Sequence, residues 1–210
     1  MKITKYEHAC LDIAKDNTRI IIDPGVFSKS LTNLQEISGL VITHIHGDHF
    51  DKEKVEKIIS DNPDVKIWTT NEVANELGIK VNIAKTGKTT LVGNISLEFF
   101  GEKHAEIDPE TPVAENTGVL VDNALYYPGD SFTECSKKFN ILAVPSSAPW
   151  LRVGQTIPII KNSTCEIVFP THDTLLSDIG YATTYNWLQK FSERNNKTFK
   201  VLSPGESLEV

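Results

Sequence analysis

Thr43-His44-Ile45-His46-Gly47-Asp48-His49 is the stretch of this 210-residue chain that says most about its fold and chemistry. It directly follows Leu40-Val41-Ile42, a short apolar run typical of a buried strand. Three histidines and one aspartate stand within six positions. Placing so many polar groups at the end of a strand is costly unless they have partners. The stretch therefore predicts a metal site.

The donor atoms in this stretch are imidazole nitrogens and a carboxylate oxygen, which suit Zn²⁺, Mn or Fe in a hydrolytic site. In an extended chain, His44 and His46 point to the same side because side chains alternate. We expect Gly47 to let the backbone turn, so that Asp48 and His49 face the same region. Four potential ligands are more than one tetrahedral ion takes conveniently from a single loop. We therefore predict two divalent metal ions, with zinc as the first choice.

Three later residues offer the same kinds of donor atom in the same setting, a loop that directly follows a predicted strand: His104, Asp130 and His172. Taken singly, each is a weak signal, because a lone histidine is more often a solvated or core residue than a ligand. Together they would complete the coordination of two ions. Pro128 and Gly129 indicate a turn immediately before Asp130.

The overall charge argues against a nucleic-acid partner. The formal net charge is −7 and no basic stripe runs along the chain, whereas phosphate binding draws on clustered Lys and Arg. A small anion held by metal ions stays compatible with this charge. No run approaches the ~20 apolar residues of a membrane span, and residues 1–8 lack the features of a signal peptide.

The cysteines are widely spaced and odd in number: Cys10, Cys135 and Cys165. They form neither a disulfide framework nor a C-x-x-C metal knuckle. Each stands in or beside an apolar stretch, so we expect reduced, buried thiols. A cytoplasmic location fits this expectation.

Short strands with a few interposed helices indicate an α/β (α+β) fold with two sheets and helices on their outer faces. We expect strands at 3–6, 9–14, 19–23, 40–43, 66–68, 80–84, 124–127, 141–144, 166–169 and near 200–202. Residues 89–121 look mostly β, with strands that include 96–100 and 117–121. We expect helices at 51–61, 72–77 and about 181–193. No repeat, low-complexity tract or linker interrupts this pattern, which favours one domain over residues 1–210.

The chain resembles the metallo-β-lactamase superfamily, and within it the small hydrolases similar to ascorbate-6-phosphate lactonase. The residues that carry the resemblance are Ile22-Asp23-Pro24-Gly25, Thr43 to His49, His104, Pro128-Gly129-Asp130-Ser131 and Pro170-Thr171-His172-Asp173. They occur in the family's order and span essentially the whole chain. The resemblance implies a four-layer αββα sandwich with the metals in a groove at one edge of the two sheets.

The resemblance also implies a role for each ligand. The first metal would be held by His44, His46 and His104, and the second by Asp48, His49 and His172. Asp130 would bridge the pair. Asp23 would support the site from behind, because metal-bound histidines need an oriented partner; alternatively, it only shapes a turn before Pro24.

Two metals about 3.5–4 Å apart can share a water and lower its pKa, so that it attacks as hydroxide. The resemblance thus implies hydrolysis of a small ester, lactone, thioester or phosphodiester, with Asp48 and Asp130 as the catalytic carboxylates. Asp48 could carry the proton or serve only as a ligand. The alternative is a non-catalytic, metal-dependent binding or sensor protein with the same fold.

Three residues are candidates for substrate contact. Trp150 and Arg152 follow the predicted strand 141–144 in a short, proline-containing loop, an arrangement that suits an apolar wall with a few placed polar groups. Arg152 could bind a phosphate or carboxylate, so we expect a small anionic substrate. His8 stands where relatives often have a Gly-His pair, although here Glu7 precedes it. Trp150 could instead close the core, Arg152 could pair with a surface carboxylate, and His8 could be an ordinary strand histidine.

Overall fold

The computed structural model describes residues 1–210, and its first seven-stranded sheet is built mainly from the N-terminal part of the chain. In spatial order, its strands are β14 (Ser207–Glu209), β1 (Lys2–Lys5), β2 (Leu11–Lys15), β3 (Thr18–Ile22), β4 (Gly39–Ile42), β5 (Lys66–Thr69) and β6 (Asn82–Ile83). Strands β3 to β6 run parallel to one another. Parallel strands need crossover connections, and those that follow β4 and β5 each contain a helix.

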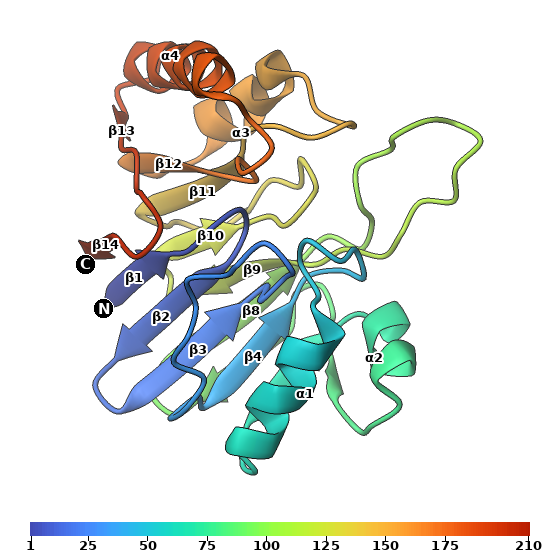
Figure 1. The fold of residues 1–210 in the computed structure, drawn as a ribbon. Coiled ribbons are helices and arrows are strands. Elements are labelled where there is room, and N and C mark those ends of the chain that lie inside the picture. The colour runs from blue at the N-terminus through green and yellow to red at the C-terminus, as the bar shows by residue number, and fades with distance from the viewer.

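A second seven-stranded sheet packs face to face with the first (Figure 1). In spatial order, its strands are β13 (Thr198–Phe199), β12 (Ile167–Thr171), β11 (Ile141–Pro145), β10 (Leu125–Tyr127), β9 (Gly118–Val121), β8 (Ile95–Phe100) and β7 (Thr89–Val92). Strands β10 to β13 are parallel, and β7, β8, β9 and β10 pair antiparallel.

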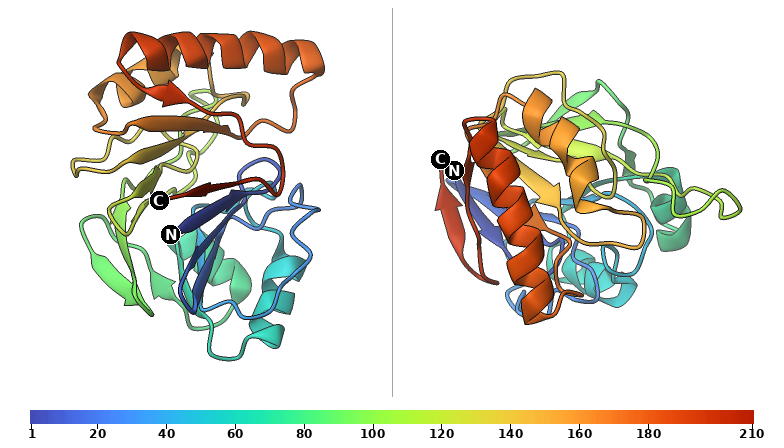
Figure 2. Two further views of the ribbon diagram at one scale, coloured as in Figure 1. Left: turned by 90° about the vertical axis from the view of Figure 1, so that its left-hand side faces the viewer. Right: turned by 90° about the horizontal axis from the view of Figure 1, so that it is seen from above.

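Helices α1 (Lys52–Asp61) and α2 (Asn71–Leu77) cover the outer face of the first sheet, and α3 (Ile157–Asn162) and α4 (Asp178–Arg194) cover that of the second (Figures 1 and 2). The Asp51 side chain caps α1 by accepting a hydrogen bond from the Lys54 amide. None of these helices has the length and apolarity that crossing a membrane requires.

Strand alternation explains why the core has three apolar layers. In β3, Ile20 and Ile22 pack between the two sheets, whereas Ile21 packs under α1 and α2. In β11, Ala143 lies in the layer between the sheets and Leu142 lies under α3 and α4. Each strand of the interior thus presents apolar side chains on both faces. The result is the predicted four-layer αββα sandwich.

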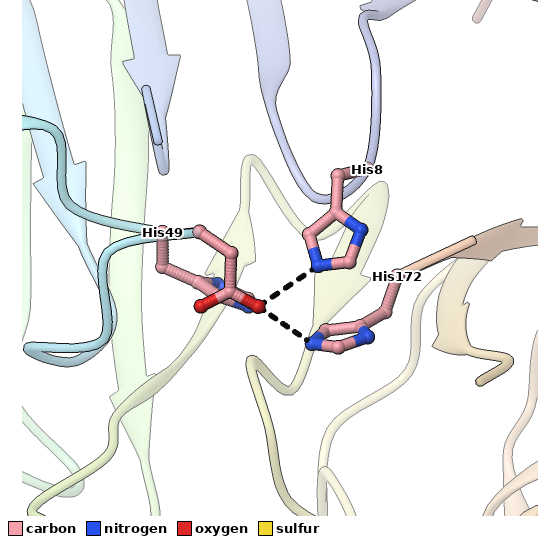
Figure 3. Close-up of side chains that lie close together, drawn as sticks. His8, His49 and His172 are labelled. Atoms are coloured by element: carbon pink, nitrogen blue, oxygen red, sulfur yellow. Dashed lines mark hydrogen bonds and ion pairs between the residues drawn. The ribbon is translucent and has the colours of Figure 1, made fainter. Parts of the chain in front are cut away.

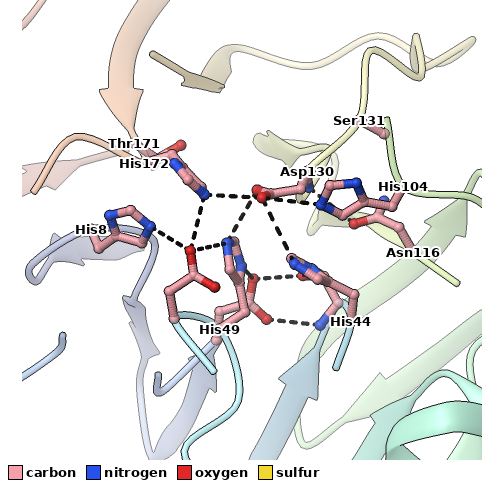
Figure 4. A network of polar contacts seen from close by, with 12 residues as sticks. His8, His44, His49, His104, Asn116, Asp130, Ser131, Thr171 and His172 are labelled. Carbon is pink, nitrogen blue, oxygen red and sulfur yellow. Dashed lines mark hydrogen bonds and ion pairs between the residues drawn. The ribbon is translucent and has the colours of Figure 1, made fainter. Parts of the chain in front are cut away.

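The functional loops leave one edge of this sandwich. Strands β8 and β10 run in the same direction, because both pair antiparallel with β9, and β12 runs with β10 through β11. The carboxyl ends of β8, β10 and β12 therefore meet at the same edge of the second sheet. The loop after β4 faces them from the first sheet (Figure 4).

Three elements differ from the sequence expectation: β13 is displaced, and β14 and α3 were not expected. The strand expected near 200–202 lies at 198–199, and the chain then forms β14, which pairs with β1 through Ile3 and Leu208. Helix α3 was not expected either. Both β14 and α3 are too short for a periodic pattern, and they form because Leu208, Ile159 and Ile160 are buried against distant strands.

Candidate metal centre

The first of two ligand clusters contains His44, His46 and His104, whose ligand atoms lie within 4.8 Å of one another. His44 and His46 come from the loop after β4, and His104 comes from the loop after β8. His44 and His104 are buried and His46 is half-buried. We expected His44 and His46 to share one side of an extended strand. However, β4 ends at Ile42 and the chain bends before His46, so the bend brings the two side chains together.

The second cluster contains Asp48, His49 and His172 together with His8, again with ligand atoms within 4.8 Å of one another. Asp48 and His49 lie in a turn in which the His49 amide donates to the His46 carbonyl over 2.9 Å. His172 directly follows β12 and has a φ of 56°, in the left-handed region that side chains disfavour. Its amide donates to the His8 carbonyl over 2.8 Å, which helps to hold this conformation.

Asp130 lies between the two clusters (Figure 4). Its Oδ1 is 3.1 Å from His49 Nε2, while its Oδ2 is 2.9 Å from His172 Nε2 and 3.4 Å from His104 Nε2. Asn116 holds the backbone here, because its Oδ1 accepts the Asp130 amide over 3.0 Å. The carboxylate can therefore reach ions in both clusters.

Close backbone packing explains which glycines the loops require. A Cβ atom on Gly25 would lie 1.8 Å from the Asp48 carbonyl oxygen, so the Pro24-Gly25 turn can pack against the ligand loop only as glycine. Gly129 has a φ of 63°, as expected for the turn before Asp130. Gly47 lies in the expected turn, and Asp48 and His49 both reach the second cluster. The turn does not require glycine, however, because Gly47 lacks a positive φ and a Cβ there would meet no atom within 4 Å.

The Nδ1 atoms of four site histidines are bonded to acceptors behind the site. His49 Nδ1 donates to Asp23 Oδ2 (2.7 Å), His104 Nδ1 to the Ala105 carbonyl (2.6 Å), His172 Nδ1 to the Ser147 carbonyl (2.5 Å) and His44 Nδ1 to Thr43 Oγ1 (3.0 Å). Carboxylates and carbonyls only accept, so in three of them the proton is on Nδ1. The Nε2 lone pairs are then available to metals, as in ligating histidines generally.

Asp23 supports both clusters. Besides His49, its Oδ2 accepts the hydroxyls of Thr43 (2.7 Å) and Tyr127 (2.9 Å), and Thr43 in turn accepts from His44. Asp23 is fully buried and has a φ of 49°. Such backbone strain persists only where the surroundings over-determine it. The sequence left open whether Asp23 is only a turn residue, and the structure places its carboxylate behind the ligands.

The atoms that face the centre are buried without hydrogen bonds: the Nε2 atoms of His44, His49, His104 and His172, and Asp130 Oδ1. Buried polar atoms are rarely left in this way, since each unpaired group costs about 1–3 kcal/mol. Their convergence fits divalent cations, because the donor set is imidazole and carboxylate with no thiolate.

The charges of the centre fit the same conclusion. Burial alone would raise the pKa of Asp130, but the imidazoles of His49 and His172 outweigh it and hold the pKa well below its usual range. Burial lowers the pKa of His44 and His46, which keeps them neutral, the form that binds metals. Burial also acts to lower the pKa of His172, but Asp130 overrides it and raises the pKa to about 9. The carboxylates thus attract positive charge to this point.

Comparison with known proteins matches residues 2–172 to the Beta-lactamase superfamily domain. The chain belongs to the metallo-β-lactamase superfamily. A UPF0173 metal-dependent hydrolase of Bacillus velezensis is 34% identical, covering 78% of this chain and 86% of its own. Protein Rv0786c of Mycobacterium tuberculosis is 28% identical over 99% of this chain and 98% of its own.

The metallo-β-lactamase fold protein YhfI from Bacillus subtilis superposes with a TM-score of 0.74 at 13% identity, over 100% of this chain and 98% of its own. That likeness confirms the fold of the superfamily. The relatives and the donor cluster together make this superfamily member a metal-dependent hydrolase.

The candidate substrate residues of this metallo-β-lactamase-fold hydrolase lie in three different settings. Trp150 is buried, and its indole N–H donates to Asp130 Oδ2 over 3.2 Å. Arg152 is exposed, and its guanidinium makes no hydrogen bond or ion pair. His8 is fully buried and reaches Asp48.

Sequence reasoning missed one buried ion pair beside the candidate ligands. Lys5 Nζ lies 2.9 Å from Asp173 Oδ2, and the Tyr185 hydroxyl donates to the same oxygen over 2.7 Å. Lys5 is only 2% exposed. The pair joins β1 to the residue after His172 and so connects the two sheets behind the second cluster. From the sequence alone, a lysine in a strand with alternating side chains does not indicate a buried ion pair.

Proposed function

We propose that this hydrolase binds two divalent ions in one centre. His44, His46 and His104 would hold the first ion, Asp48, His49 and His172 the second, and Asp130 would contact both. The observation that carries this proposal is the position of Asp130: Oδ1 lies near His49 of the second cluster, and Oδ2 lies near both His172 of the second and His104 of the first, all buried, unpaired imidazoles. One closed four-ligand site would leave the remaining donors buried without a partner.

The donor set is compatible with zinc, which we propose as the native metal, and with manganese or iron. When bound, such ions would polarise the scissile carbonyl or phosphoryl group and lower the pKa of a water molecule towards neutrality. The protein's own contribution is to fix the ligands. Asp23 and three backbone or side-chain oxygens orient the imidazoles, and Asn116 and Trp150 hold Asp130.

The substrate would approach past His46 and Asp48, which are the partly exposed members of the centre. Asp48 has a side-chain exposure of 23%, whereas Asp130 is only 2% exposed, so Asp48 is the carboxylate that can meet a substrate or exchange a proton with solvent. Whether Asp48 carries a proton or only ligates is left open by this geometry. Burial acts to raise its pKa, but the imidazoles of His172 and His8 outweigh burial and keep it ionised.

We propose that the substrate is a small, anionic ester, lactone, thioester or phosphodiester. The unpaired guanidinium of Arg152 supports an anionic group, because the chain otherwise carries a net charge of −7 and would repel one. The narrower resemblance to ascorbate-6-phosphate lactonase and the cytoplasmic location stay predictions.

The test combines metal analysis with a substrate screen. Protein purified without chelator and titrated with Zn²⁺ should saturate at two ions per chain, and the loaded protein should hydrolyse members of a panel of anionic lactones, esters, thioesters and phosphodiesters. An Asp130→Ala variant should lose both properties, whereas Asp64→Ala, which changes an exposed aspartate, should keep them. Saturation at one ion would contradict the dinuclear centre.

A further inference from the structure

His8 lies at the tip of the turn between β1 and β2, inside the edge of the sandwich that carries the metal ligands (Figure 3). The turn is closed by the Tyr6 amide, which donates to the Cys10 carbonyl over 2.8 Å. His8 itself has a φ of 64°, which a residue with a side chain adopts at a cost. No part of its ring is exposed. A ring that is held in this way has no surface left for a substrate.

The polar contacts of His8 are with the second ligand cluster. Its Nε2 lies 3.0 Å from Asp48 Oδ2. Its ring centroid lies 3.9 Å from that of His172, and its carbonyl accepts the His172 amide over 2.8 Å. Phe27 covers another side of the ring, with centroids 5.1 Å apart. His8 thus connects a ligand from the first sheet with a ligand from the second.

The two ring nitrogens of His8 are used in the opposite way to those of the proposed ligands. In His44, His49, His104 and His172, Nδ1 is bonded behind the site and Nε2 is unpaired. In His8, Nε2 is bonded to a carboxylate and Nδ1 is the unpaired atom. The contact between His8 Nε2 and Asp48 Oδ2 has the geometry of a hydrogen bond, in which the carboxylate can only accept, so Nε2 carries the hydrogen and has no lone pair to offer a metal.

We propose that His8 is a positioning residue for the second metal ion. Its Nε2–H fixes the orientation of the Asp48 carboxylate, and its ring supports His172, so that these two ligands are assembled before an ion arrives. The proposal rests on the dinuclear function proposed above. In this proposal His8 orients the metal ligand Asp48, whereas the sequence suggested that His8 contacts the substrate.

Three variants separate this role from a general structural one. His8→Ala removes the donor. His8→Gln places an amide N–H where Nε2 stands, so it can still reach Asp48. Asparagine tolerates the left-handed backbone, so His8→Asn should keep the turn. Its side chain is shorter, and its amide reaches only the position of Nδ1, so the contact with Asp48 is lost. Circular dichroism and thermal melts would establish that each variant is folded.

The measurement is the affinity of each of the two ions, obtained by titrating Zn²⁺ against a chromophoric chelator. We expect His8→Ala and His8→Asn to raise the Kd of the second ion about 10–100-fold, the range seen when a partner of a metal ligand is removed. We expect the Kd of the first ion to stay within about twofold and His8→Gln to recover most of the loss. The visible spectrum of the Co²⁺-loaded His8→Gln protein should match that of the original protein.

Two results would overturn the proposal while the dinuclear centre stands: an unchanged second Kd in folded His8→Ala, or a changed Co²⁺ spectrum in His8→Gln, which would make His8 a ligand. If the original chain saturates at one ion, the proposed function and the role of His8 both fail. The stoichiometry of the original chain therefore distinguishes the two failures.

Discussion

The indole nitrogen of Trp150 donates a hydrogen bond over 3.2 Å to the same Asp130 oxygen that lies 2.9 Å from His172 Nε2. The indole ring also stands 5.4 Å from the His104 ring, edge to face. Trp150 therefore closes one side of the centre with an apolar ring while its single polar atom orients the carboxylate between the clusters. The loop after β11 thus contributes to the centre through a residue that cannot itself bind a metal.

Replacing Trp150 with Phe keeps most of the ring and removes the N–H. A hydrogen bond to a charged group contributes about 1.5–3 kcal/mol, so we expect a loss of roughly tenfold to a hundredfold in kcat/KM or in metal affinity. Metal titration and steady-state kinetics would measure both. Trp187→Phe on α4, at a partly exposed tryptophan, is the matched control. If the two variants behave alike, the hydrogen bond has no role.

Asp23→Asn should weaken metal binding although Asp23 faces neither ion. The charged acceptor of His49 is lost, so we expect the Kd of the second ion to rise about 10–100-fold. The first ion should be affected less, because Asp23 reaches His44 only through Thr43. Thr43→Val should have the opposite effect and raise the Kd of the first ion more than that of the second. If each variant raised the Kd of both ions equally, Asp23 would not act on the first ion through Thr43 and on the second through His49.

Asp130→Ala and the single histidine variants should differ in stoichiometry. Asp130→Ala removes the carboxylate between the clusters and should cost both ions much of their affinity, whereas His172→Ala should weaken mainly the second ion and His104→Ala mainly the first. Elemental analysis after dialysis against a fixed free zinc concentration should find almost no zinc in Asp130→Ala. It should find about one ion per chain in His172→Ala and about one in His104→Ala. Full metal content and activity in Asp130→Ala would rule out its bridging role.

Lys5→Met should destabilise the fold because it leaves Asp173 buried without its cationic partner. Breaking a buried ion pair from one side costs about 3–5 kcal/mol, measured here by urea unfolding. The double variant Lys5→Met with Asp173→Asn should be less destabilised than the sum of the two single variants. Strict additivity would show that the pair makes no net contribution.

Arg152→Ala should raise the KM of an anionic substrate about tenfold with little change in kcat, which corresponds to about 1.4 kcal/mol of binding free energy. The guanidinium is exposed and unpaired, so it is free to meet an anion. The control is Arg194→Ala, at an exposed arginine at the end of α4. An unchanged KM with an anionic substrate would exclude Arg152 from the site and leave the metals as the anion receptor.

Local sequence was sufficient to predict much of the fold and the donor cluster. Alternating or continuous apolar runs such as Ile20 to Ile22 placed most strands, because burial on two faces leaves a pattern within a few residues. The donors at 44–49, 104, 130 and 172 were recognisable because each stands in the loop that follows such a run. Short elements left no such pattern, so α3 and β14 were missed.

By itself, the sequence determined which donor residues stand at strand ends, and therefore that one edge of the sandwich would hold a metal centre. Only the tertiary structure decided how each side chain is used there. His8 and His49 are the same residue type, yet His8 turns Nε2 to Asp48, 40 positions away, while His49 turns Nδ1 to Asp23. Which nitrogen faces the candidate metal centre is set by the acceptor that packs behind the ring. That acceptor comes from a distant part of the chain, where no local pattern records it.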